Sequence, residues 1–379
     1  MTPMKFVALI SGGKDSCFNI LHCLKQGHEL VALANLYPID ATEQELNSFM
    51  FQTVGHDIVS LYDKCTGMPL YRQPIKPDSS KNVELNYTRT ENDEIEDLFL
   101  LLSKVKSEIP DLGGVSVGAI LSSYQRTRVE DVCARLNLVS LSYLWQRDQL
   151  DLMTEMCSIS KQDPEKDDGN MDARIIKVAA IGLDESSLNK SLPQIFPVLK
   201  KLNERYDVHI CGEGGEFETM VVDAPFFSNG RLKVISHNPD LSDSHDGVYS
   251  TRLEIEFEEA KRDLNLQNQL EDLPTPPLLN EKWMDLLEVL KQQHDSVQHS
   301  IKMPPITSDA DKALNKISIS RLGNIQFISN IKPRNFFATV QEQANDVFHQ
   351  LGAILSERGL NPSQGLFCSL SLSDMSNFA

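Results

Sequence analysis

A short glycine-rich segment near the N-terminus constrains the fold of this chain more than any other feature. The segment Ser11-Gly12-Gly13-Lys14-Asp15-Ser16 lies between a strand-like apolar run at residues 6–10 and a helix-like run at residues 16–25. Such a turn directs several main-chain N–H groups at one point, where they and the positive end of the helix dipole can hold phosphate oxygens. The sequence therefore predicts a strand, a phosphate-binding loop and a helix in succession.

The motif differs from a Walker A loop, which has four residues between its first glycine and the Gly-Lys pair. It resembles the PP-loop of the ATP pyrophosphatases, Ser-Gly-Gly-x-Asp-Ser, a family that cleaves ATP between its α- and β-phosphates. An ordinary Gly-Gly turn is the alternative, but the serine, lysine and aspartate around the glycines favour the phosphate site. The resemblance implies that ATP is bound by Ser11, Gly12, Gly13, Lys14, Asp15 and Ser16.

The composition excludes several classes of protein. A length of 379 residues allows two or three domains, and a formal net charge of -18 disfavours a nucleic-acid-binding surface or an anionic membrane as partner. The first ten residues are too short for a signal peptide, and no run of apolar residues is long enough to span a membrane. Seven scattered cysteines indicate reduced thiols, and the dispersed cysteines and histidines indicate no metal site made by protein alone. We therefore expect a cytosolic (cytoplasmic) protein.

Strand-like and helix-like segments alternate over residues 5–237, which predicts an α/β fold with a doubly wound, mostly parallel sheet covered on both faces. Thr90 or Asn92 is the expected cap of the second amphipathic helix after the phosphate loop. The polar segment 158–172 has no periodicity and is expected to be an exposed insertion without a function. The predicted helices cover residues 54–65, 95–105, 128–136 and 192–206, and the predicted strands cover 29–36, 70–75, 115–121, 174–180 and 208–211.

The pattern changes after residue 237. One more half-buried strand is expected around Leu253, Ile255 and Phe257, and an amphipathic helix around Trp283. Two strands at 317–321 and 325–330 flank a Gly323-Asn324 turn, a hairpin signal, and a helix over 339–358 and a strand over 366–372 follow. We thus expect an ATP-pyrophosphatase-type domain at 1–237, an extension and linker at 238–310, and an α+β segment at 311–379.

A second glycine-rich motif follows the strand predicted at 208–211. It reads Gly212-Glu213-Gly214-Gly215-Glu216-Phe217-Glu218-Thr219. Ligands of open α/β sheets bind at the carboxyl ends of the strands, so this acidic loop and the phosphate loop should share one site. Three carboxylates so close together repel one another unless they meet cations. A flexible acidic surface loop is the alternative.

A third block, residues 118–128, also follows a predicted strand and contains Tyr124, Arg126 and Arg128. Arginine can hold a phosphate or a carboxylate through two parallel hydrogen bonds. The alternative is an ordinary helix start whose arginines pair with Glu130 or Asp131. His56 lies opposite the apolar face of its predicted helix and is expected to be a partly exposed or capping residue.

These blocks, together with residues 53–56 and 143–148, resemble the diphthine-ammonia ligases (diphthamide synthetases) over residues 4–237. Eukaryotic members of that family are similar in carrying Rid-type domains after the ligase. The segment 311–379 resembles the first half of such a domain, and we expect it to be truncated because the remaining strand and helix are missing.

The resemblance implies an enzyme that amidates the diphthine carboxylate on translation elongation factor 2, with ATP and ammonium as co-substrates and AMP and pyrophosphate as products. Lys14 and Asp15 would act in catalysis, Asp15 would hold Mg²⁺, and Ser11 and Ser16 would donate hydrogen bonds to phosphate. The trimethylammonium of diphthine or the ammonium would meet Glu213, Glu216 and Glu218, with a cation-π face from Phe217 or Tyr124. Arg126, Arg128, Gly214, Gly215 and Thr219 complete the expected substrate site.

Three alternatives stay open. The chain could be another PP-loop enzyme, such as a tRNA-modifying thiolase or a lysidine-type synthetase, although its acidity and lack of paired cysteines disfavour this. It could be a nucleotide-sensing module without catalysis. It could also act mainly in oligomerisation through its Rid-like segment.

Overall fold

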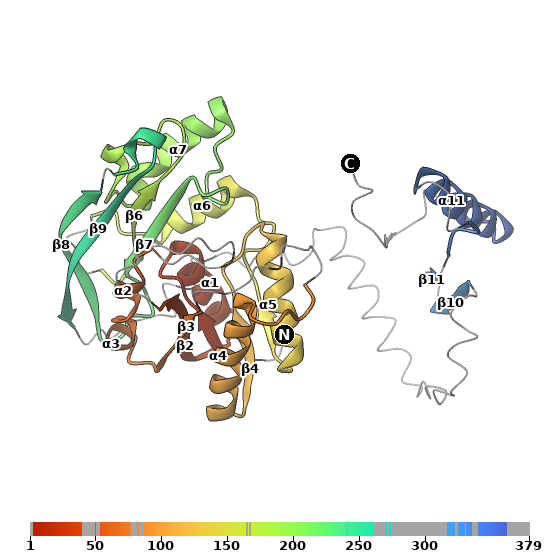
Figure 1. Cartoon of the computed structure of the whole chain (residues 1–379), viewed down its shortest axis with the longest axis horizontal. Coiled ribbons are helices and arrows are strands. Elements are labelled where there is room, and N and C mark those ends of the chain that lie inside the picture. Colours follow the sequence, from red (N-terminus) through yellow and green to blue (C-terminus); the bar gives the residue numbers. More distant parts are fainter. Residues whose placement is uncertain are drawn as a thin grey trace. The chain divides into compact units, whose positions relative to one another are not determined.

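We describe a computed structural model of the chain (Figure 1). It divides into two units, Met1–Asn280 and Glu281–Ala379, and each is described by itself. In the described part of the chain no helix is both long and apolar enough to cross a membrane. The structure describes residues 3–39, 50, 54–76, 82, 87–163, 166, 168–240, 242–260, 270, 273, 317–322, 325–329, 331–335 and 340–361.

The first unit begins with a five-stranded sheet in which every strand pair is parallel. Its spatial order is β3-β2-β1-β4-β5, so the chain moves outward from β1 to β3 and then returns to the other side of β1. The crevice between β1 and β4 is therefore the point where the strand order reverses, and ligands of such sheets bind there. The strands are β1 (Lys5–Leu9), β2 (Glu29–Pro38), β3 (Leu70–Ile75), β4 (Leu112–Ser116) and β5 (Val139–Leu141).

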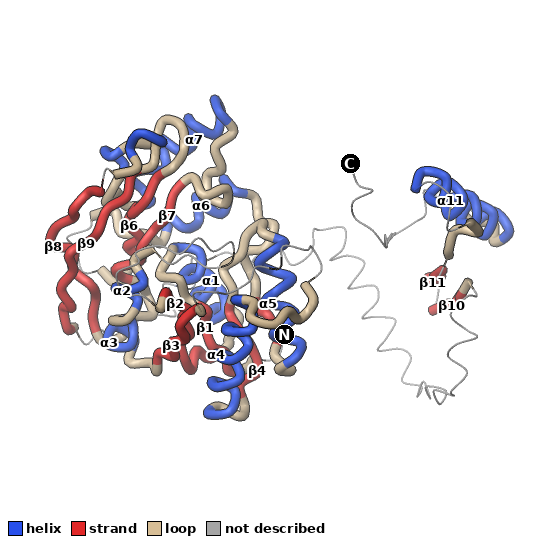
Figure 2. The backbone as a smooth tube through the Cα atoms, viewed as in Figure 1, coloured by secondary structure: helices blue, strands red, loops and turns tan. Residues whose placement is uncertain are grey.

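Both faces of this sheet are covered, as the alternating sequence predicts (Figure 2). Because successive strand residues point to opposite faces, Phe6 and Ala8 of β1 join one buried cluster and Val7 joins another. The first cluster contains α1 (Lys14–Lys25), and the second contains α4 (Glu94–Glu108) and α5 (Ser123–Arg135). The predicted α/β architecture is confirmed here.

Two details of the helices differ from the predictions. Asp93, not Thr90 or Asn92, caps α4 by accepting a hydrogen bond from the Ile95 N–H, because Asn92 has a left-handed backbone (φ 60°). The helix predicted over 54–65 is two short helices, α2 (His56–Val59) and α3 (Tyr62–Thr66), which still bury their apolar side chains on one side. Thr53 lies outside the described residues.

The second half of the first unit is not part of the parallel sheet, and that prediction was wrong. A separate four-stranded sheet has the order β7-β6-β9-β8, and all its pairs are antiparallel. Hydrophobic periodicity locates strands but carries no information on their direction. The predicted strand at 208–211 is a turn, and a strand begins only at Phe217. The strands are β6 (Asp172–Val178), β7 (Phe217–Asp223), β8 (Gly230–Asp240) and β9 (Tyr249–Glu259).

The antiparallel sheet packs on the same side of the parallel sheet as α1. Side chains of α1, such as Phe18, share one buried cluster with Ile175 of β6, Met220 of β7 and Leu232 of β8. Two further helices, α6 (Gln149–Ser158) and α7 (Leu192–Tyr206), add apolar side chains to this cluster. The start of α1 is thus enclosed between the two sheets.

The prediction that the segment 158–172 is an exposed insertion was only partly right, because Gln162, Asp163, Lys166 and Asp168 are exposed but residues 159–161 and 171–172 are buried. Ser160, Lys161 and Asp172 are buried, and the Lys161 ammonium lies 2.6 Å from a carboxylate oxygen of Asp223 on β7. The main-chain N–H of Lys161 donates to the Met171 carbonyl, and this hydrogen bond joins the two ends of the segment. A polar sequence was mistaken for a solvated one because the partner carboxylate comes from a distant strand.

The boundary expected at residue 237 falls inside β8, which pairs with β9 from Gly230 to Asp240. The second unit contains an antiparallel hairpin of β10 (Ser318–Leu322) and β11 (Ile325–Ser329), followed by α11 (Val340–Glu357). These elements confirm the hairpin and helix expected from the sequence. The predicted helix near Trp283, the Gly323-Asn324 turn and the strand at 366–372 lie outside the described residues.

Candidate active site

Three loops meet near the carboxyl end of β1. The phosphate loop connects β1 to α1, residues 117–122 connect β4 to α5, and the acidic loop precedes β7. The Lys14 N–H donates to the Thr219 hydroxyl (2.9 Å), and the Leu121 N–H donates to a carboxylate oxygen of Glu213 (2.8 Å). The contacts bring together the three segments that sequence motifs had predicted to form one site.

Close packing shapes the phosphate loop. Gly12 has φ 89°, and a Cβ atom there would lie 2.8 Å from the Met220 sulfur and from a Val59 methyl group. The Ser11 hydroxyl accepts a hydrogen bond from the Gly13 N–H, and the Ser16 hydroxyl donates to the Gly13 carbonyl. Both serine hydroxyls thus hold the loop itself together.

Lys14 is buried, with 3% of its surface exposed, instead of reaching into solvent. Its ammonium donates to the Cys211 carbonyl oxygen (2.6 Å) and to a carboxylate oxygen of Asp15 (2.8 Å). It also lies 5.0 Å from the centre of the Phe217 ring. The ring face that we had expected to meet a cationic substrate therefore meets the cation of Lys14.

The charge of Lys14 is secured by its neighbours. Burial is the largest single effect and acts to lower the pKa of Lys14, but Asp15, Cys211 and Glu218 together outweigh it, and the pKa is raised from its usual value. One carboxylate oxygen of Asp15, Oδ2, accepts the hydrogen bond from the Lys14 ammonium. Among the described residues the other oxygen, Oδ1, is buried and has no hydrogen-bond partner.

Asp15 has the features of a metal ligand. A buried carboxylate oxygen without a protein partner fits a cation, and Mg²⁺ is commonly held by one or two carboxylates plus phosphate oxygens. No group of three or more His, Cys, Asp or Glu side chains in the described part of the chain is placed to hold a metal ion. The residues therefore fit a magnesium ion that arrives with a nucleotide.

Glu213 is the acidic-loop carboxylate that reaches the other loops. Besides its bond to the Leu121 N–H, its pKa is raised from the usual value by burial and then by the negative charge of Asp15. Gly118 allows the β4–α5 loop to approach, because a Cβ there would lie 2.6 Å from the Ser16 nitrogen. Glu218 lies half-buried on β7, where its charge also acts on Lys14.

Glu216 has a different environment. Its carboxylate accepts hydrogen bonds from the main-chain N–H groups of His209 (3.0 Å) and Gly214 (2.7 Å), so it stabilises the conformation of its own loop. The imidazole of His209 accepts a bond from the Cys211 N–H (3.2 Å). The sequence analysis missed His209 because a single histidine before a glycine-rich loop carries no recognisable pattern. Gly214 and Gly215 are exposed at the tip of the loop.

The arginine block is mostly engaged within the protein. Arg126 pairs with Glu130 (2.6 Å), as the simpler interpretation predicted, and its guanidinium lies over the Trp145 ring. Arg128 is fully buried, donates to the Tyr124 and Asn82 carbonyls, and stacks on the Tyr124 ring at 3.4 Å. The Tyr124 ring therefore already faces a cation of the chain itself. His56 begins α2 partly exposed and stacks on Tyr37.

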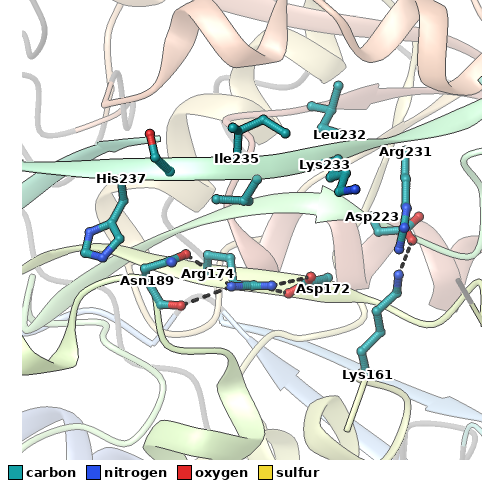
Figure 3. A pocket seen from close by; sticks show the side chains of 12 residues that line it. Lys161, Asp172, Arg174, Asn189, Asp223, Arg231, Leu232, Lys233, Ile235 and His237 are labelled. Carbon is teal, nitrogen blue, oxygen red and sulfur yellow. Dashed lines mark hydrogen bonds and ion pairs between the residues drawn. The ribbon is translucent and has the colours of Figure 1, made fainter. Parts of the chain in front are cut away.

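A separate polar cavity of about 260 Å³ lies between β6 and β8 (Figure 3). Arg174 holds Asp172 with two hydrogen bonds and also contacts Asn189, while Lys161 points at Asp223. None of the residues lining the cavity belongs to the phosphate loop or the acidic loop. Each carboxylate in this cavity already pairs with a lysine or arginine side chain. The cluster therefore stabilises the antiparallel sheet and is not the site of chemistry.

Comparison with known proteins identifies two domains of one family in the first unit. Residues 4–140 match the model of the diphthamide synthase N-terminal domain, and residues 165–263 match that of the diphthamide synthase C-terminal domain. The C-terminal match extends past residue 237 and includes all four strands of the antiparallel sheet.

Three relatives named diphthine-ammonia ligase illustrate the similarity. The protein from Saccharomyces cerevisiae is 52% identical over 383 residues, covering 99% of this chain and 54% of the relative. The protein from Schizosaccharomyces pombe is 38% identical, covering 99% of this chain and 60% of the relative. The chain thus spans little more than half the length of these two proteins.

The third relative, from Rattus norvegicus, is shorter. It is 52% identical over 227 residues, and the match covers 59% of this chain and 80% of the relative. Such identity over most of a relative's length shows common descent, and both family models match within the first unit. The chain belongs to the diphthine-ammonia ligase family.

Proposed function

We propose that this chain joins ammonia to the carboxylate of diphthine on translation elongation factor 2, and that the reaction converts ATP to AMP and pyrophosphate. The observation that carries the proposal is the convergence of the phosphate loop and the acidic loop on Lys14. One loop suits an anionic nucleotide, and the other places carboxylates beside it for a cationic substrate. Membership of the ligase family supports the same reaction.

The chemistry requires activation of the carboxylate. Ammonia cannot displace oxide from a carboxylate, so the carboxylate must first attack the α-phosphate of ATP and become an acyl adenylate. Pyrophosphate leaves in this step, and AMP leaves when ammonia attacks the acyl carbon. Ammonium loses one proton to become nucleophilic ammonia, and the nitrogen loses a second proton as the amide forms, which completes the balance.

The phosphate loop would stabilise the departing pyrophosphate. The Asp15 and Ser16 N–H groups in the first turn of α1 have no acceptor within the helix, and the helix dipole favours an anion there. Lys14 supplies a fixed positive charge whose position is set before substrate binds. Such preorganised charge lowers the barrier because it needs no rearrangement during the reaction. Mg²⁺ held by Asp15 would neutralise phosphate charge.

The acidic loop would recognise the cationic partner. Glu213 lies nearest to the other two loops, and Glu218 follows on β7, so these two carboxylates are proposed to meet ammonium or the trimethylammonium of diphthine. Glu216 is engaged within the loop and contributes by holding it. Thr219 fixes the backbone of Lys14. We assign no phosphate contact to Arg126 or Arg128.

The test is product analysis with each substrate omitted in turn. Continued formation of AMP should need ATP, ammonium and diphthine-bearing elongation factor 2 together, whereas without ammonium the release of pyrophosphate should stop after about one turnover. AMP formation without the factor would point to another acceptor, and binding of ATP without any AMP would point to a nucleotide-sensing module. A tRNA-dependent reaction would favour the other PP-loop enzymes.

We also propose that residues 311–379 belong to a Rid-like domain. The β10–β11 hairpin followed by α11 supports this, since it matches the order of elements expected for the first half of that fold. A cytoplasmic location follows from the proposed substrate, because translation factors act there.

A further inference from the structure

The acidic loop is held by two side chains that lie within or beside it, His209 and Glu216. The Glu216 carboxylate bridges the His209 N–H and the Gly214 N–H, at 3.0 and 2.7 Å. The His209 imidazole nitrogen Nδ1 accepts from the Cys211 N–H and the Glu213 N–H, at 3.2 and 3.5 Å. Four main-chain N–H groups of residues 209–214 thus donate to these two side chains.

These two side chains determine where the loop presents its functional groups. Cys211 carries the carbonyl that receives the Lys14 ammonium, and Glu213 carries the carboxylate that receives the Leu121 N–H. Both residues are also held through their own N–H groups by His209. Any movement of the imidazole would therefore displace the carbonyl partner of Lys14 and the carboxylate of Glu213 together.

The hydrogen bonds also define the state of the imidazole. A ring nitrogen that accepts two N–H donors carries no proton, so the proton of a neutral ring lies on Nε2. Burial lowers the pKa of His209, the negative charge of Glu216 opposes this effect and the positive charge of Lys14 adds to it, and the net shift is downward, which favours the neutral ring. The two hydrogen bonds thus assign Nδ1 as the acceptor of the ring.

We propose that His209 and Glu216 are positioning residues, which hold the acidic loop so that the Cys211 carbonyl fixes Lys14 and the Glu213 carboxylate faces the site. The proposal deepens the proposed function, on which its kinetic test rests. It assigns Glu216 to the loop instead of to the cationic substrate, and it gives a role to a histidine that no motif identified.

Substitutions at His209 can separate its two ring nitrogens. The side-chain amide oxygen of asparagine is as many bonds from Cα as Nδ1, whereas the amide of glutamine reaches the position of Nε2. His209→Ala should lower the rate of AMP formation on the order of 10²-fold, the loss typical of a misplaced reacting group. His209→Asn should restore most of that rate, and His209→Gln should not. His245→Ala, at an exposed histidine, is the matched control.

The pH profile and the behaviour of Glu216 complete the kinetic test. Because the imidazole transfers no proton, His209→Asn should keep both limbs of the pH–rate profile of the unsubstituted protein. Glu216→Gln should reduce the rate, because its amide NH₂ would face one of the two N–H donors. Glu204→Gln, at an exposed position, is its control. Equal rates for the Asn, Gln and Ala variants at 209, or loss of a limb in His209→Asn, would overturn the proposal.

Amide hydrogen exchange of the full chain gives a readout that does not depend on activity. The Cys211 and Glu213 N–H groups should exchange faster in His209→Ala and stay protected in His209→Asn. Unchanged protection in His209→Ala would contradict the positioning role even if the chain forms no AMP. Conversely, the variants could show this exchange pattern while the unsubstituted protein makes no AMP. That result would refute the proposed function and leave the role of His209 in the loop standing.

Discussion

The ammonium of Lys14 and the main-chain carbonyl of Cys211 lie 2.6 Å apart, although 197 residues separate them in the sequence. This contact joins the first helix of the parallel sheet to the loop that enters the antiparallel sheet. Lys14 is consequently a fixed, buried charge whose position depends on both halves of the unit.

Replacing Lys14 should abolish most of the nucleotide chemistry. In Lys14→Ala the phosphate loop loses its fixed cation, and the rate of AMP formation should fall roughly 10²- to 10³-fold. The Cys211 carbonyl and Asp15 would also lose their donor, which should reduce the free energy of unfolding by about 1 to 3 kcal/mol. Steady-state kinetics and thermal denaturation measure the two effects. Lys201→Ala, at an exposed lysine, is the control, and near-normal AMP formation by Lys14→Ala would refute the assignment.

Replacing Asp15 should change the dependence on magnesium. Asp15→Asn keeps an oxygen for the Lys14 ammonium but removes the negative charge offered by Oδ1, so more Mg²⁺ should be needed for half-maximal AMP formation. A magnesium titration at saturating ATP measures this shift, with Asp207→Asn at an exposed position as control. If the titration curves of Asp15→Asn and the unsubstituted protein coincide, Asp15 is not a ligand.

Replacing Glu213 should separate stability from activity. The folded protein raises the pKa of Glu213 above its usual value of 4.5, so the folded state holds a proton that the unfolded state releases. The ionised carboxylate is therefore unfavourable in the folded state, and its contribution to stability falls as the pH rises through the raised pKa. Glu213→Gln should raise the Tm at neutral pH, and the difference should vanish below about pH 4.5.

The same variant should bind its cationic substrate poorly. Because the carboxylate charge is gone while the shape is kept, the KM for ammonium or for the modified factor should rise in Glu213→Gln and the KM for ATP should stay unchanged. Glu204→Gln should alter neither constant. A rise confined to the KM for ATP would place Glu213 in the nucleotide site.

Breaking the buried pair of Lys161 and Asp223 should destabilise the antiparallel sheet. The ammonium and the carboxylate are 2.6 Å apart and each is about 1% exposed, so removal of Lys161 takes a buried cation away from the Asp223 carboxylate. Lys161→Met should lower the free energy of unfolding by about 3 to 5 kcal/mol. Chemical denaturation of the first unit measures this loss, and Lys166→Ala, at an exposed lysine, should have little effect. Equal stability of the two variants would show that the pair is unimportant.

The sequence was sufficient where the signal is local. The phosphate loop could be predicted because its glycines, Lys14 and Asp15 are contiguous and lie between a strand and a helix. The hairpin of β10 and β11 was likewise predictable from the Gly323-Asn324 pair in the sequence between two apolar segments. Four of the five strands of the parallel sheet, although not their ends, followed from the alternation of apolar segments, whereas the short β5 (Val139–Leu141) was not predicted.

The sequence was insufficient where the structure depends on distant partners. The direction of β6 and β7 is set by how the chain returns after α7, and no periodicity records that path. Lys161 seemed exposed because Asp223 is 62 residues away, and the burial of Lys14 could not be predicted because the Cys211 carbonyl belongs to another loop. For the same reason the acidic loop could be recognised, while the separate roles of Glu213 and Glu216 could not.

The most direct test of the proposed ligase is the mass of its protein product. Elongation factor 2 that bears diphthine would be incubated with the full chain, ATP and either ordinary or nitrogen-15 ammonium, and the peptide with the modified histidine would be weighed. The account predicts conversion of the carboxylate to an amide, with the isotope difference between the two products and one AMP released per amide. A peptide of unchanged mass in both reactions, despite AMP formation, would contradict it.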